Sequence, residues 1–120
     1  MPFRKRPRDP ARHKTERFEG WWHVAAASPY PNVGGKIEWD GFASGDSEIE
    51  LFAIVPDLPD GSGVAVMWGD VEVMTVTARG GVLKRDLETK DGDDVPRLAG
   101  EQVELHHQGV VIARTRLDPD

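Results

Sequence analysis

Cysteine is absent from the 120 residues of this chain. Its absence excludes disulfides, thiolate metal sites and cysteine nucleophiles. Long hydrophobic runs are also missing, and none approaches the roughly 18 apolar residues of a membrane-spanning helix. The charged opening residues are not followed by an apolar segment, so the sequence predicts no secretory signal. We therefore expect a cytoplasmic protein, or a component of a larger particle.

Nucleotide-binding and hydrolase motifs are missing too. The sequence has no G-x-G-x-x-G, no Walker motif and no G-x-S-x-G, because Ser62 sits in Asp60-Gly61-Ser62-Gly63. The 19 acidic residues after position 17 make chance carboxylate pairs easy, and the chain is short for a cleft that holds a large substrate. We expect a protein that is not an enzyme and has no cofactor.

Charge is segregated along the chain, although the formal net charge is only −6. Residues 1–17 carry seven basic and two acidic residues (+5), and the remainder carries eight basic and 19 acidic residues (−11). Pro2, Pro7 and Pro10 prevent a regular helix over the first ten residues. The sequence predicts a flexible basic arm over residues 1–17 and an acidic domain over residues 18–120. The candidate partner-binding residues of the arm are Arg4, Lys5, Arg6, Arg8, Arg12, Lys14 and Arg17.

Such an arm has three interpretations. It contacts an acidic surface of its own or a neighbouring chain, it binds the phosphates of a nucleic acid, or it is solvated without a partner. Its only neighbouring aromatic residues are Phe3 and Phe18, which does not favour base stacking. The acidic domain would also repel a nucleic acid, so any phosphate binding would depend on the arm alone.

The remainder of the chain alternates apolar and polar residues in short runs between turn-forming residues, and no ten-residue segment has helical periodicity. This pattern predicts an all-β fold, an antiparallel β-sandwich or small barrel of about eight strands with an extended N-terminal arm. The predicted strands are Gly20–Ala27, Lys36–Ala43, Ser47–Val55, Val64–Trp68, Val71–Ala78, Val82–Thr89, Glu101–His107 and Val110–Leu117.

Two local features refine this prediction. Gly69-Asp70 favours a type II′ hairpin that pairs Trp68 with Val71 and Val66 with Val73, and the apolar pattern shifts after Val73, which indicates a bulge or a second buried face. Phe52 and Ile54 interrupt the polar side of their strand. We therefore expect both faces of that end of the strand to be covered.

Residues 63–117 contain VAVMWGDVEVMTVTARGGVL, then the loop TKDGDDVP, then GEQVELHHQGVVIARTRL. This order of hairpin, glycine-centred turn, acidic loop and closing hairpin resembles a module of poorly characterised bacterial proteins. The resemblance covers about half of the chain and depends on turn motifs. It implies an antiparallel β fold and no activity.

Metal binding has little support. His106 and His107 are adjacent on a predicted strand and so point to opposite faces, and His23 is the one further histidine that we expect near either. The acidic stretch 86–94 lacks the D-x-[DN]-x-[DN]-G spacing of a calcium loop and includes Lys90. We therefore predict no metal site.

The four tryptophans have two expected roles. Trp22, Trp39 and Trp68 lie in alternating strands and are expected in the core. Trp21 shares a face with His23 and is expected either to contact a partner or to be covered by a loop or the arm. The sequence thus predicts a non-catalytic interaction or assembly module, whose basic arm contacts a neighbouring subunit or an acidic partner. The alternatives are nucleic-acid tethering through the arm and binding of a small ligand or carbohydrate through exposed tryptophan.

Overall fold

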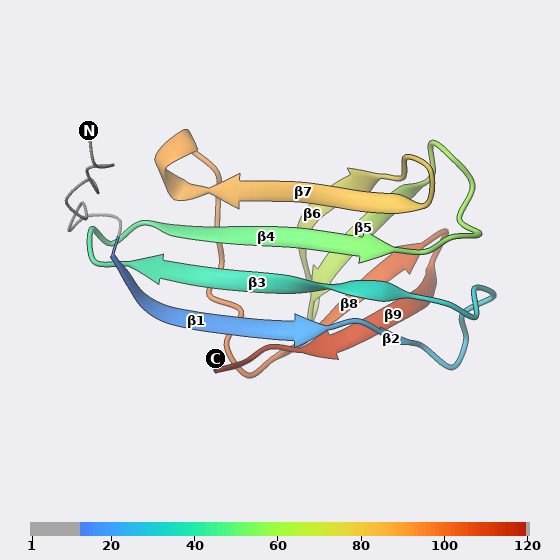
Figure 1. The fold of residues 1–120 in the computed structure, drawn as a ribbon, viewed down its shortest axis with the longest axis horizontal. Helices are drawn as coiled ribbons and strands as arrows, with labels where there is room; N and C mark the ends of the chain where they lie inside the picture. The colour runs from blue at the N-terminus through green and yellow to red at the C-terminus, as the bar shows by residue number, and fades with distance from the viewer. Residues whose placement is uncertain (1–12, 120) are drawn as a thin grey trace, which may run out of the picture.

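The computed structural model describes residues 13–119 as two antiparallel five-stranded sheets that pack face to face (Figure 1). The predicted all-β sandwich is confirmed. Sheet A has the order β10-β1-β3-β4-β7, and sheet B has the order β2-β9-β8-β5-β6. The strands of sheet A are β1 (Lys14–Trp21), β3 (Gly34–Phe42), β4 (Ser47–Ile54), β7 (Val82–Glu88) and β10 (Asp118–Pro119). Those of sheet B are β2 (His23–Val24), β5 (Gly63–Trp68), β6 (Val71–Thr77), β8 (Gln102–His107) and β9 (Val110–Arg116).

Seven of the eight predicted strands match observed strands to within two residues at each end. Outside the strands, a short 3₁₀ helix, η2 (Thr89–Asp91), follows β7. Over residues 13–119, no helix is long and apolar enough to span a membrane.

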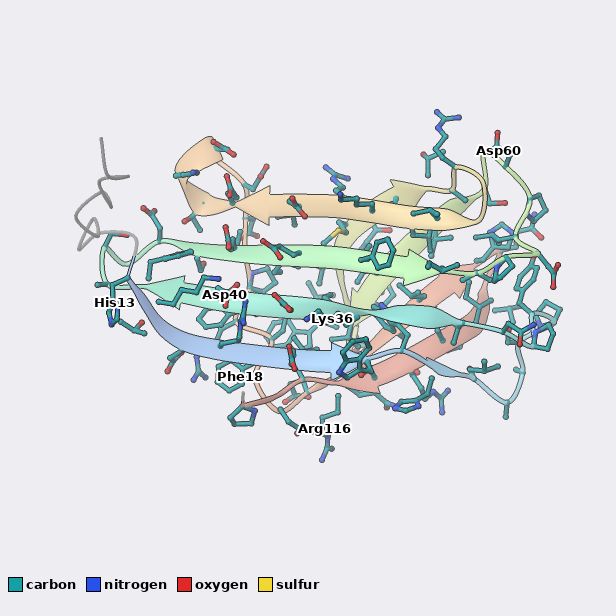
Figure 2. The ribbon with its side chains drawn as sticks, viewed as in Figure 1. His13, Phe18, Lys36, Asp40, Asp60 and Arg116 are labelled. Atoms are coloured by element: carbon teal, nitrogen blue, oxygen red, sulfur yellow. The ribbon has the colours of Figure 1, made fainter. Side chains whose placement is uncertain are left out.

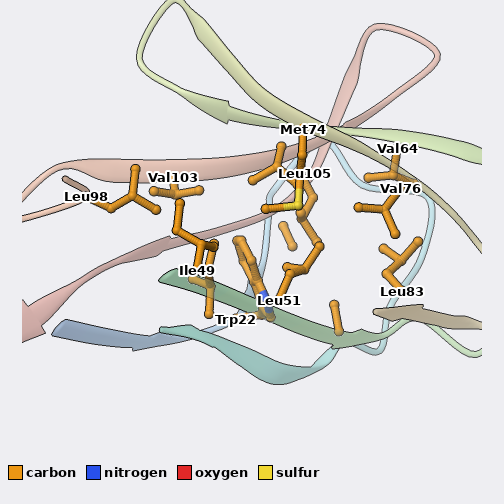
Figure 3. Close-up of a cluster of buried hydrophobic side chains, with 14 of the residues drawn as sticks. Trp22, Ile49, Leu51, Val64, Met74, Val76, Leu83, Leu98, Val103 and Leu105 are labelled. Carbon is orange, nitrogen blue, oxygen red and sulfur yellow. The ribbon is translucent and has the colours of Figure 1, made fainter. Parts of the chain in front are cut away.

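The core lies between the two sheets and contains the apolar side of each alternating strand (Figure 3). Ile37, Ile49 and Leu51 from sheet A meet Val66 and Leu105 from sheet B, all of them buried. Burial of such side chains stabilises a fold by about 1.5–3 kcal/mol each before entropy is counted. Trp22 and Trp39 are buried and Trp68 packs partly against this core, as predicted.

The prediction of one strand over Gly20–Ala27 is wrong. β1 begins at Lys14 and belongs to sheet A, and the chain then passes to sheet B through the buried Trp22. Val24 is exposed while Ala25 is buried, so the expected alternation ends where the chain changes sheets. Gly20 allows β1 to approach β9 closely just before the chain changes sheets, because a Cβ atom there would lie 2.6 Å from the Arg116 carbonyl oxygen of β9.

The predicted domain boundary at residue 17 falls inside β1, since residues 14–17 pair with β3. This strand is difficult to recognise because few of its side chains face the core, among them Phe18. The strand is evident only in the structure, where it pairs with β3 so that Arg17 lies opposite Asp40 and Glu19 lies opposite Glu38.

The hairpins follow the glycine positions. β5 and β6 pair Trp68 with Val71, as predicted, but Val66 pairs with Met74 because Val73 forms a bulge. The predicted pair of Val66 with Val73 is therefore wrong, while the expected bulge is present. Phe52 and Ile54 are 40% and 37% exposed, so the expected cover over that end of β4 is absent from the described part of the chain.

Candidate functional site: a carboxylate face on sheet A

The outer face of sheet A carries the densest set of charges in the described structure. Strand register aligns two transverse rows across β1, β3, β4 and β7. The first row is Arg17, Asp40, Glu48 and Glu88, and the second row is Glu19, Glu38, Glu50 and Asp86. We call these two rows the carboxylate face, because seven of their eight side chains are acidic. Figure 2 shows Asp40 on this face, with further carboxylates along β4 and β7.

The half of the carboxylate face on β1 and β3 is neutralised by its own cations. The Arg17 guanidinium donates through Nε to Asp40 at 3.0 Å and through Nη2 to Glu38 at 3.2 Å. Lys36 Nζ contacts Glu38 and lies 3.4 Å from Glu19 Oε2. These contacts hold the pKa of Glu38 below its usual range, although burial opposes the shift. This half is therefore charged but electrically balanced.

The half on β4 and β7 has far less compensation. Lys90 Nζ lies 3.6 Å from Glu88 Oε2. No cation among residues 13–119 forms an ion pair with Glu48, Glu50 or Asp86. Since the three side chains lie on adjacent strands, this half has a concentrated negative potential.

Two acidic groups in the first row are buried even though they face away from the core. Asp40 is 0% exposed, and its Oδ2 atom accepts no hydrogen bond from residues 13–119, although Lys14 Nζ lies 3.5 Å away. Glu48 is 8% exposed. Burial, a side-chain hydrogen bond with Glu88 and the charges of Glu50 and Asp40 raise the pKa of Glu48 to about 7. Asp40 has Arg17 and Lys14 as cations, whereas no cation among residues 13–119 pairs with Glu48. An added positive charge at this row would therefore stabilise the ionised form of Glu48.

Burial first, and then the charges of Glu38, Asp86 and Asp40, raise the pKa of Glu50 as well. The shift has the sign expected for carboxylates that crowd one another, because each negative charge disfavours ionisation of its neighbour. A bound cation would relieve this repulsion.

The carboxylate face ends in a third row that contains aromatic rings. Register aligns Trp21, Lys36, Phe52 and Lys84. Lys36 Nζ lies 5.3 Å from the centroid of the Trp21 ring, within cation–π distance. Trp21 is 58% exposed. The outer face of sheet A thus changes from acidic to partly apolar along the strands.

The structure distributes the sequence-predicted partner-binding residues over three places. Lys14 and Arg17 lie in β1, where they pair with Asp40 of their own chain. Trp21 and His23 are both exposed, but they lie on strands of different sheets and do not form the shared strand face that was expected. The remaining five, Arg4, Lys5, Arg6, Arg8 and Arg12, lie outside the described residues.

The histidines of β8 have separate contacts. His106 Nε2 lies 2.9 Å from Glu104 Oε1, and His107 Nδ1 lies 3.1 Å from the Gly63 carbonyl oxygen. Arg114 of β9 also contacts Glu104, at 3.4 Å. Over residues 13–119, no group of three or more histidine and acidic side chains is arranged to hold a metal ion.

The sequence indicated the outward acidic residues of each strand but not their assembly. Alternation within the predicted strands places Glu48 and Glu50 on one side of their strand, and Asp86 and Glu88 on one side of another. The missing information was the strand order, which brings β7 beside β4 although β5 and β6 separate them in the sequence.

No family model matches the chain, and no curated protein matches it. The resemblance of residues 63–117 to a bacterial β module therefore stays a prediction.

Proposed function

We propose that this protein is a non-catalytic interaction module that associates with a neighbouring subunit through its basic segment, residues 1–12. This segment carries five basic residues and one acidic residue. The observation that supports the proposal is that no cation among residues 13–119 pairs with the carboxyl groups of Glu48, Glu50 and Asp86, whereas other carboxylates of the same sheet have ion pairs. Charge complementarity of this kind speeds association and selects the partner.

The position of the basic segment supports the same function. It joins β1 at the end of sheet A where β3 and β4 are connected, since the Ala43 amide donates to the His13 carbonyl oxygen at 2.8 Å. Twelve extended residues reach roughly 40 Å, which is enough to meet a second molecule. The same sheet repels polyanions, which disfavours nucleic-acid tethering.

Light scattering of the full chain after size-exclusion chromatography tests the proposal. We expect the wild type to self-associate at low ionic strength, and the double variant R4Q/R6Q to be monomeric. The matched control is R79Q/R116Q, which removes two exposed arginines from the β-domain and should associate as the wild type does. A monomeric wild type at low salt overturns the proposal. Binding of DNA by the wild type, lost in R4Q/R6Q without any self-association, would favour nucleic-acid tethering instead.

A further inference from the structure

We propose that Glu48, Glu50, Asp86 and Glu88, the β4–β7 half of the carboxylate face, form the docking surface for residues 1–12 of a second copy of this chain. This inference rests on the proposed function and names the surface that receives the basic segment. The negative charge of this surface is only partly compensated, by Lys90, and the buried carboxylate of Asp40 lies beside it.

The first argument is electrostatic. Arg17 and Lys36 already hold the carboxylates of β1 and β3, so incoming cations find their strongest attraction over β4 and β7. The buried Asp40 Oδ2, which accepts no hydrogen bond from residues 13–119, adjoins this half through the pairing of Asp40 with Glu48. An arginine over the first row would give Glu48 a cation that residues 13–119 do not supply, and charge-assisted bonds of this kind are the strong ones.

The second argument is spacing. Glu48 and Glu50 are two residues apart on one strand, so their Cα atoms are separated by about 6.7 Å, as are those of Asp86 and Glu88. Arg4 and Arg6 have the same spacing in an extended segment. Proline favours that conformation, because the residue before Pro7 is restricted to extended geometry. Arg6 can therefore lie over the first row while Arg4 lies over the second.

The third argument is the order of residues. In an extended segment, residues two positions apart share a side, so Pro2 lies on the side of Arg4 and Arg6, whereas Phe3 points away from it. With Arg4 over the second row, Pro2 falls over the third row, where the Phe52 ring is 40% exposed. A segment with a proline followed by alternating arginines thus matches a face that changes from partly apolar to acidic. This match also sets the direction of the docked segment along β4.

The direction of β1 favours a second copy over the same molecule. β1 runs antiparallel to β3, and its first residue lies at the β3–β4 end of the sheet (Figure 1). To reach Glu50 of its own chain, the segment would have to reverse direction at that end. A second copy related by a twofold axis needs no reversal, and the exchange is reciprocal, with two docked segments in each dimer.

A charge-swap experiment on the full chain tests the surface. E50K/D86K reverses the charge of two exposed positions on the face, and R4E/R6E reverses the segment. Each variant alone should be monomeric by sedimentation velocity, because like charges then meet. An equimolar mixture should form a dimer about as tightly as the wild type, because each segment meets a face of opposite charge in the partner. A mixture that stays monomeric while the wild type dimerises overturns the inference.

Variants that remove charge without reversing it are less apt to disturb folding and provide a second test of the docking surface. E50Q/D86Q should weaken dimerisation about a hundredfold, because the reciprocal dimer loses two exposed ion pairs of about 0.7 kcal/mol each at both of its faces. The control E72Q/E101Q removes two exposed carboxylates elsewhere and should change dimerisation less than about twofold. If R4Q/R6Q abolishes association and E50Q/D86Q does not weaken it, the inference fails while the proposed function stands. If the wild type is monomeric, both fail.

Discussion

At the scale of single residues, Glu48 is the side chain of the carboxylate face whose ionisation is most strongly disfavoured by its surroundings. Burial and the surrounding carboxylates raise its pKa to about 7, whereas a glutamate in an unfolded chain titrates near 4.3. Between these two pH values the folded protein holds a proton that the unfolded chain has released. Stability from this group therefore falls as the pH rises from about 4.3 to about 7.

The variant E48Q isolates this effect, because glutamine resembles the protonated side chain and cannot ionise. Between pH 5 and pH 8, the free energy of unfolding of the wild type should fall relative to E48Q by about 1–3 kcal/mol. Urea unfolding of monomeric protein at both pH values measures this difference. E101Q, at an exposed position, should follow the wild type; parallel pH profiles for E48Q and the wild type would contradict the assignment.

Individual core residues are the part of this molecule that the sequence predicts best. In the predicted strands Lys36–Ala43 and Ser47–Val55, alternation of apolar and polar residues alone predicts that Ile37, Trp39, Ile49 and Leu51 face the core, and all four are buried. Alternation works there because β3 and β4 are central strands whose inner faces meet the opposite sheet. It fails at Val24, where the chain leaves one sheet for the other and the backbone no longer follows a single pleat.

At the scale of elements, the two-residue hairpin loops show how turn chemistry sets register. Gly69 has φ 57° and Asp70 does not have positive φ, whereas Gln108 and Gly109 both do, at 51° and 78°. Positive φ at both central residues is the pattern of a type I′ turn, which favours Asn-Gly. Gln108 is the one described residue other than glycine with positive φ.

Replacing Gln108 with asparagine should therefore stabilise the β8–β9 hairpin. Asparagine tolerates the left-handed conformation better, so we expect Q108N to raise the free energy of unfolding by about 0.5–1 kcal/mol. The midpoint of urea unfolding provides the measurement. D70N is the control, because Asp70 lacks positive φ and an asparagine introduced there should have little effect on the free energy of unfolding. A midpoint for Q108N at or below that of the wild type would show that this turn is not strained.

Elements with apolar periodicity were predictable, and β1 was not. Its charged residues Lys14, Glu16 and Arg17 resemble the basic segment that precedes them, so composition assigns residues 14–17 to the arm, whereas the structure places them in β1. What holds these residues in the sheet is their contact with distant parts of the chain. Arg97, for example, pairs with Glu16 at 3.0 Å and stacks on the Phe18 ring from a loop about 80 positions away. A sequence pattern cannot show such pairing.

At the scale of the whole molecule, the carboxylate face depends on strand order. β4 and β7 become neighbours only because the β5–β6 hairpin crosses to the other sheet. This arrangement brings Glu48 beside Glu88, forty positions later in the chain. The charge of each strand can be predicted from the sequence, but the concentration of carboxylates on β4 and β7 follows from the topology.

The same topology predicts how association depends on pH. Glu48 faces Asp40 on β3, Glu50 on its own strand and Glu88 on β7, and it gains its negative charge as the pH rises through about 7. Because a more negative face binds a basic segment more tightly, the wild-type dimer should strengthen about threefold to tenfold between pH 6 and pH 8. E48Q lacks this ionisation, while every other group that titrates over this range is common to both proteins. Sedimentation velocity at the two pH values should therefore show a clear rise for the wild type and a smaller one for E48Q. Equal rises in the two proteins would mean that the docked segment does not contact the first row.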